Sequence, residues 1–169
     1  MYLEFTPVSA EVAQRIRVVS RAVGHPSIVV AVIAGILIVS FGLLLSFKFD
    51  PIMIFTVIMG LLSSLFALFS GITLVKGPHY VKTGDLNVTY ARQSRRLLLI
   101  FWIATIVPTG IAVLFSVPRG TDEFFTPAFL GYFALLWVPF VTALIDMLVG
   151  IPLLKPPDQL VQQYGGAQR

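Results

Sequence analysis

The chain has 169 residues, of which 57% are hydrophobic and 12% are charged, and its mean hydropathy is +0.90. A soluble domain normally has about a quarter of its residues charged, so this composition excludes an ordinary water-soluble domain and indicates an all-α integral membrane protein. The net charge of +4 does not indicate a nucleic-acid partner, because the basic residues flank apolar segments, and the absence of cysteine excludes disulfides and thiolate metal sites.

The N-terminal segment, residues 1–25, is predicted to be a cytoplasmic amphipathic element. From about Pro7 to Ala22 aliphatic residues recur at helical spacing while Glu and Arg occupy other faces, which predicts a helix lying in the headgroup layer. A soluble helix that packs on a partner protein is the alternative. Gly24-His25-Pro26 is expected to end this helix and turn the chain into the membrane. The first long apolar run begins only there, so we expect no cleavable signal peptide.

Four apolar segments that follow are each long enough to cross a bilayer, since a spanning helix needs about 20 mostly apolar residues. Asp50-Pro51 and Thr126-Pro127 resemble the cap and first turn of the second and fourth helices. The sequence therefore predicts a four-span bundle over residues 26–155, with spans at about 26–47, 51–75, 97–117 and 127–154.

The connecting segments are short. Between the second and third spans we expect a turn and then a helix that begins at Leu86, with Asp85 as its N-cap. Residues 156–169 are expected to form a polar cytoplasmic tail that is mobile or bound to a partner.

The orientation follows from the distribution of Lys and Arg. Only Lys48 and Arg119 lie on one side of the predicted spans, whereas the other ten of the twelve basic residues lie on the opposite side. The positive-inside rule makes that second side cytoplasmic. We therefore predict a multi-pass protein of the cell membrane with both termini in the cytoplasm.

The ends of the second and fourth spans carry similar sequences, GITLVKGP from Gly71 and GIPLLKPP from Gly150, at an offset of 79 residues. This similarity predicts that the bundle consists of two similar helical hairpins in a 2+2 tandem repeat. The alternative is that helix ends often use Gly, Lys and Pro in this order, without any duplication.

Small residues define a predicted packing face on the same two spans. Residues three or four positions apart share one helical face, and small ones allow close helix approach in lipid. Gly35 and Gly42 of the first span are expected to face this surface. The predicted face comprises Gly60, Ser64, Ala67 and Gly71 on the second span, with Thr142 and Gly150 on the fourth.

Asp146 is the one ionisable residue well inside a predicted span. Such residues are costly in lipid and usually face the bundle, so a proton or cation site is one interpretation. The other interpretation is structural: Asp146 lies in the cytoplasmic half, about 13 Å from Lys155 along the helix. A water-accessible or protonated carboxyl group there would be satisfied by a hydroxyl such as that of Thr142 or by an Arg at the cytoplasmic end. The sequence alone slightly favours the structural interpretation.

No cofactor, metal site or catalytic site is predicted. His25 and His79 are the only histidines, and both lie at the cytoplasmic ends of spans, where cap or turn roles are commoner than haem ligation. The sequence contains no nucleotide-binding, metalloprotease or nucleophile-elbow motif.

The sequence therefore favours a non-catalytic membrane protein, an accessory or scaffolding subunit of a larger membrane complex. Its expected partners are the lipid bilayer and other membrane subunits or further copies of itself. The alternative is a small oligomeric transporter or channel with Asp146 as its coupling carboxylate. An enzyme ranks third. Three absences favour a subunit: there is almost no extramembrane mass, no catalytic constellation and no visible polar path across the bilayer. The small-residue faces and the amphipathic N-terminal helix suit packing.

Overall fold

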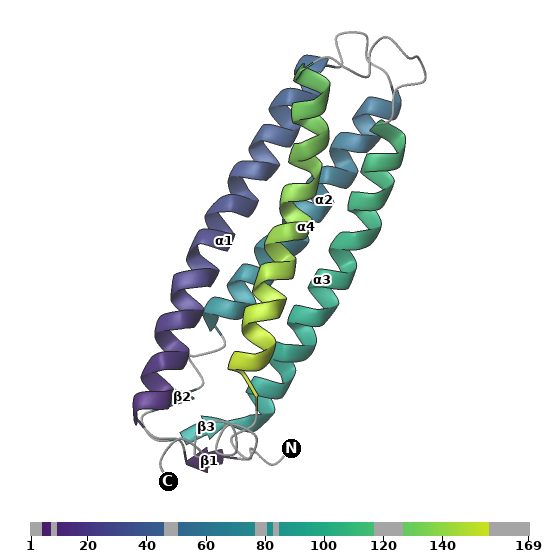
Figure 1. Cartoon of the computed structure of the whole chain (residues 1–169). Coiled ribbons are helices and arrows are strands. Elements are labelled where there is room, and N and C mark those ends of the chain that lie inside the picture. The colour runs from purple at the N-terminus through teal and green to yellow at the C-terminus, as the bar shows by residue number, and fades with distance from the viewer. Residues whose placement is uncertain are drawn as a thin grey trace.

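The computed structural model describes residues 5–7, 10–45, 51–76, 81–82, 85–116 and 127–155. These residues form four long helices, α1 (Ala10–Leu45), α2 (Pro51–Lys76), α3 (Val88–Ser116) and α4 (Pro127–Leu153), which run side by side along the molecule (Figure 1). Each contains a stretch long and apolar enough to cross a bilayer: Ala10–Gly42, Pro51–Lys76, Tyr90–Phe115 and Leu130–Leu153. The chain is therefore an all-helical, multi-pass membrane protein, and this part of the prediction is confirmed.

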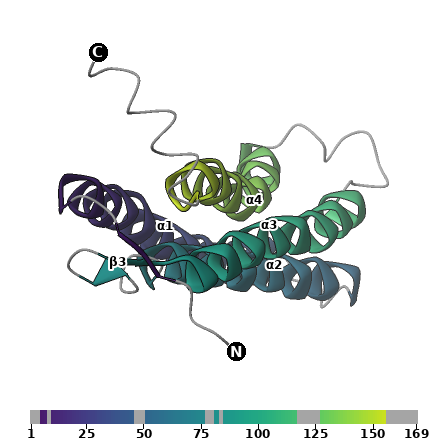
Figure 2. The ribbon, with the colours of Figure 1, turned by 90° about the horizontal axis from the view of Figure 1, so that it is seen from below.

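The four helices form a bundle in which α2 and α4 make contact across the centre. Each of these two helices also packs against both α1 and α3. Figure 2 shows this arrangement from the lower end of the bundle. Because α2 contacts all three other helices, side chains on its buried face meet residues from every other part of the bundle.

The buried positions of the helices recur every seven residues. In α2 they fall into three such series: Thr56, Ser63, Ser70; Gly60, Ala67, Leu74; and Ser64, Gly71. A seven-residue repeat keeps one face toward neighbouring helices when the helices coil around one another with a left-handed twist. The other helices follow the same rule, with Ala13, Ser20, Ser27 and Ala34 in α1, Ala91, Leu98, Thr105 and Ala112 in α3, and Tyr132, Pro139 and Asp146 in α4.

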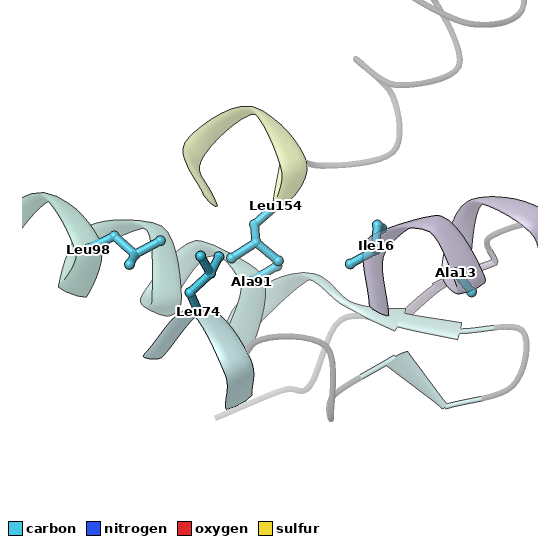
Figure 3. Packing of buried hydrophobic residues seen from close by; sticks show 6 residues of the cluster. All are labelled: Ala13, Ile16, Leu74, Ala91, Leu98 and Leu154. Carbon is cyan, nitrogen blue, oxygen red and sulfur yellow. The ribbon is translucent and has the colours of Figure 1, made fainter. Parts of the chain in front are cut away.

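Three apolar clusters occupy different levels of the core. The cluster at the lower end joins all four helices through Ala13, Ile16, Leu74, Ala91, Leu98 and Leu154 (Figure 3). A small middle cluster consists of Ala31, Ala67 and Ala143, and the upper cluster of Ile38, Ala112, Tyr132 and Leu136. Small side chains in the middle allow the helix backbones to approach closely there.

The N-terminal segment departs from its prediction. It is helical, but the expected break at Gly24-His25-Pro26 is absent, and α1 continues without interruption from Ala10 to Leu45. Its buried residues extend the buried face of the spanning part, and Ile16 packs in the lower cluster. The predicted break at Gly24-His25-Pro26 is therefore wrong, and residues 10–25 are not a separate helix.

The reason lies at Gly24, which contacts α2 and does not end the helix. A Cβ on Gly24 would lie 3.1 Å from the carbonyl oxygen of Gly71, and a Cβ on Gly71 would lie 3.3 Å from that of Gly24. The two glycines thus allow the backbones of α1 and α2 to cross in contact. Pro26 is exposed in the middle of α1, where neighbouring helices stabilise a proline-containing span.

A small antiparallel sheet lies at the lower end of the bundle (Figure 1). Its strands are β1 (Phe5–Pro7), β2 (Val81–Lys82) and β3 (Asp85–Asn87), in the order β1-β3-β2. Phe5 pairs with Asn87 and Val81 with Leu86. The predicted N-cap at Asp85 is therefore wrong: this residue belongs to a strand, and α3 begins at Val88. The predicted tail, residues 156–169, lies outside the described residues.

Candidate functional site

Asp146 lies in the interior of the bundle, on the buried face of α4. Its side chain has an exposed fraction of 0%. The Ser27 hydroxyl of α1 donates a hydrogen bond of 2.6 Å to Asp146 Oδ1. The Ser70 hydroxyl of α2 lies beside the same carboxyl group. Three helices therefore supply polar groups to one point of the core.

The hydrogen bonding of this carboxyl group is incomplete. Within the part of the chain that the structure describes, neither Asp146 Oδ2 nor the Ser70 hydroxyl has a hydrogen-bond partner of ordinary geometry. Burying an ionised carboxylate with a single hydroxyl donor costs several kcal/mol. The arrangement therefore suits a carboxyl group that carries a proton, or one that is paired with a cation.

Two further polar levels lie along α2 above Asp146. Ser63 and Thr109 of α3 share a buried hydrogen bond of 2.6 Å between their hydroxyl oxygens. Still higher, Thr56 lies beside the buried hydroxyl group of Tyr132. Since Thr56, Ser63 and Ser70 are seven residues apart, successive levels are about 10 Å apart along the helix. We call these side chains the polar seam: Ser27, Thr56, Ser63, Ser70, Thr109, Tyr132 and Asp146.

Several other buried hydroxyls are satisfied within their own helices. Ser64 donates to the Gly60 carbonyl oxygen at 3.1 Å, and Thr142 donates to that of Val138 at 2.8 Å. Such bonds let Ser and Thr act as small packing residues in a spanning helix. Thr142 is therefore not the hydroxyl that satisfies Asp146, contrary to the suggestion from the sequence; Ser27 has that role.

The structure buries every residue of the predicted packing face. A Cβ on Gly71 would lie 3.0 Å from the side chain of Ile28, and one on Gly60 would lie 2.9 Å from that of Ile38. Gly150 contacts Leu98 of α3, and a Cβ there would lie 3.1 Å from Leu74. The glycines of α2 therefore face α1, whereas Gly150 faces α3 and α2. Gly60, Ser64, Ala67, Gly71, Thr142 and Gly150 all lie inside the bundle.

A groove of about 490 Å³ lies between α1 and α4, on the outside of the bundle. Ser27 and Thr142 contribute hydroxyl groups to its wall, and apolar residues such as Val30 and Val141 form most of the rest. Trp137 also lines it and is 41% exposed. Ser27 is thus shared between the groove and the carboxyl group of Asp146.

The histidines do not contribute to this site. His25 is exposed on α1, and His79 lies outside the described residues. Among the described residues there is no group of three or more His, Cys, Asp or Glu side chains that would hold a metal ion.

Sequence reasoning identified Asp146 but missed its partners Ser27 and Ser70. A signal for them was present, because small residues recur every seven positions in both spans that carry these serines. That repeat assigns Ser27 and Ser70 to buried faces. It does not show which level of one helix meets which level of another, so the pairing needed the structure.

Comparison of the chain with protein-family models, with curated proteins and with solved structures finds no match. The functional argument therefore depends on the geometry alone.

Proposed function

We propose that the chain is a small membrane carrier for protons or monovalent cations, in which Asp146 is the coupling group. The observation that supports this proposal is the complete burial of Asp146 between three helices, with one carboxyl oxygen lacking a partner. Intramembrane carboxyl groups of this kind are a common means of binding and releasing a proton or cation.

The polar seam changes the balance between the two functions considered from the sequence. The lack of a polar path was one of the grounds for preferring an accessory subunit, whereas the core contains polar side chains at three levels. The levels are too far apart for direct hydrogen bonds between them, so transport requires water or helix movement between levels.

An accessory or scaffolding subunit is the second candidate. The observation that favours it is the sheet at the lower end, where β1 and β2 form the two edges. Edge strands are able to pair with a strand of another protein. In this role Asp146 only holds α1 and α4 together through Ser27.

We also propose the orientation of the chain and its origin from an internal repeat. The distribution of Lys and Arg favours cytoplasmic termini, which would place Asp146 in the cytoplasmic half of the membrane. The offset of 79 residues superimposes Ser63 on Thr142, Ala67 on Asp146 and Gly71 on Gly150, and all six residues are buried. This agreement supports descent of the two hairpins from one, with the carboxyl group in only one half.

Purification of the full chain in a mild detergent tests the proposal against its rival. A carrier is expected to purify alone or as a homo-oligomer, with no other protein in fixed ratio. Other membrane proteins that purify with the chain in fixed stoichiometry, and that are lost together with it, would favour the accessory subunit.

A further inference from the structure

The groove between α1 and α4 combines an apolar wall with a carboxyl group buried close behind it. Its volume of about 490 Å³ lies within the range of small-molecule sites, about 300–1,000 Å³. Most of its wall is aliphatic, and Trp137 provides an aromatic surface. Because it opens on the outside of a membrane bundle, a ligand enters it from the lipid phase.

Ser27 connects this groove to the interior. Its side chain lines the groove, and its hydroxyl group donates to Asp146 Oδ1 at 2.6 Å. Thr142 and Ile145, which also line the groove, are one turn and one residue from Asp146 on α4. The carboxyl group is therefore one side chain behind the wall, and a ligand in the groove would reach it only if Ser27 rotated.

We propose that this groove binds lipophilic organic monocations, whose apolar parts contact α1 and α4 and whose charge pairs with Asp146. The argument for this occupant is charge complementarity. No charged side chain lines the groove within the described part of the chain, and the carboxyl group behind Ser27 has an oxygen without a partner. A cation over the face of Trp137 gains a further attraction.

This inference rests on the carrier function proposed above and specifies its substrate. A carboxyl group in lipid is unstable as an unpaired anion, so it holds either a proton or the organic cation. Arrival of one monocation then releases one proton, and charge is conserved. Binding and protonation therefore compete at Asp146, and the two exchange across the membrane in a one-to-one ratio.

Equilibrium binding of radiolabelled tetraphenylphosphonium to the full chain in detergent tests the inference. Binding is expected to weaken as the pH falls, and to weaken at least about tenfold in Asp146→Asn, which keeps the hydrogen bond from Ser27 but loses the charge. Val141→Phe, which fills the groove, is expected to weaken binding by a similar factor. The matched control is Val107→Phe on α3. Val107 is 62% exposed and does not line the groove, so this variant is expected to bind tetraphenylphosphonium normally.

The two tryptophans provide a second readout. Trp137 lines the groove, whereas Trp102 packs against the middle cluster. In Trp102→Phe, binding of ethidium, an absorbing lipophilic cation, is expected to quench the remaining fluorescence strongly. In Trp137→Phe the quenching is expected to be at least halved.

Several outcomes would overturn the inference. If Asp146→Asn bound the cation as well as the unmodified chain does, the charge of Asp146 would have no role in binding. If a doxyl-labelled lipid quenched the fluorescence of Trp137 and tetraphenylphosphonium did not reduce that quenching, the groove would be a site for ordinary acyl chains. Proton flux that depends on Asp146 without any cation binding would refute this inference and leave the carrier function standing. Cation binding without flux would refute the carrier function and keep the site.

Discussion

At the residue scale, Asp146 is satisfied differently from the buried hydroxyl groups of Ser64 and Thr142. Ser64 and Thr142 donate to carbonyl groups of their own helices and need nothing from their neighbours. Asp146 instead depends on a donor from another helix, Ser27, and retains an unpartnered oxygen. This difference identifies the carboxyl group as a place where a small change in helix position alters the chemistry.

Glycines at helix contacts give the first prediction. Gly71→Leu and Gly150→Leu are expected to destabilise the bundle by about 1–3 kcal/mol each, because a bulky side chain has no room against α1 or α3. Thermal unfolding in detergent measures the change.

The chain contains its own controls for this experiment. A Cβ on Gly110 or Gly131 would have no neighbour within 4 Å, so Gly110→Leu and Gly131→Leu are expected to be nearly neutral. Leu61→Phe, at a lipid-facing side chain that is 39% exposed, is expected to be equally mild. Similar losses in all five variants would refute the packing face.

At the scale of elements, the continuous α1 is the feature that most needs testing. In the structure Ile16 and Leu154 belong to one buried cluster (Figure 3). Because the chain has no cysteine, the double variant Ile16→Cys, Leu154→Cys contains only the two thiols to be cross-linked. A short bismaleimide is expected to link the two, as seen by a mobility shift on a gel after cleavage of the chain between them.

A helix lying flat in the headgroup layer gives a different result. It would hold residue 16 away from α4, and cross-linking would not exceed that of the control Val18→Cys with Leu154→Cys. Val18 is 58% exposed and lies on the outer side of α1.

The elements that the sequence predicts well are those set by length and apolarity, such as α2 and α4. The error at Pro26 arose because proline and glycine were read as a helix end. In a membrane bundle, Gly24 instead serves close contact with Gly71, and packing outweighs the missing hydrogen bond. The strand at Asp85–Asn87 was missed because one of its pairing partners, β1, is about 80 residues away, and the other, β2, is only two residues long.

The candidate site shows the same limit of sequence reasoning. An aspartate inside an apolar run is visible in any hydropathy analysis. Its donor Ser27 is 119 positions away and resembles many other small residues of α1. Only the relative heights of the helices, which packing determines, select this serine.

At the scale of the whole molecule, the charge asymmetry predicts the topology. Reporter fusions at Ser9, Asp85 and Gln168 are expected to report the cytoplasm, and a fusion at Thr121 the outside. Each fusion site is tested with two reporters: alkaline phosphatase, which is active outside the cytoplasm, and a fluorescent protein, which fluoresces inside it. An outside signal from Asp85 would reverse the bundle and place Asp146 in the outer half of the membrane.

The central claim is that Asp146 couples transport, and ion flux in reconstituted vesicles tests it most directly. Vesicles that contain the full chain and a pH-sensitive dye are given a gradient of protons or of a monovalent cation, and Asp146→Asn is compared with the unmodified chain. Asparagine still accepts the hydrogen bond from Ser27 but carries no charge, so assembly and thermal stability are expected to persist while flux falls to the level of protein-free vesicles. Flux by Asp146→Asn equal to that of the unmodified chain, or no flux by either, would contradict the account and leave Asp146 a structural link between α1 and α4.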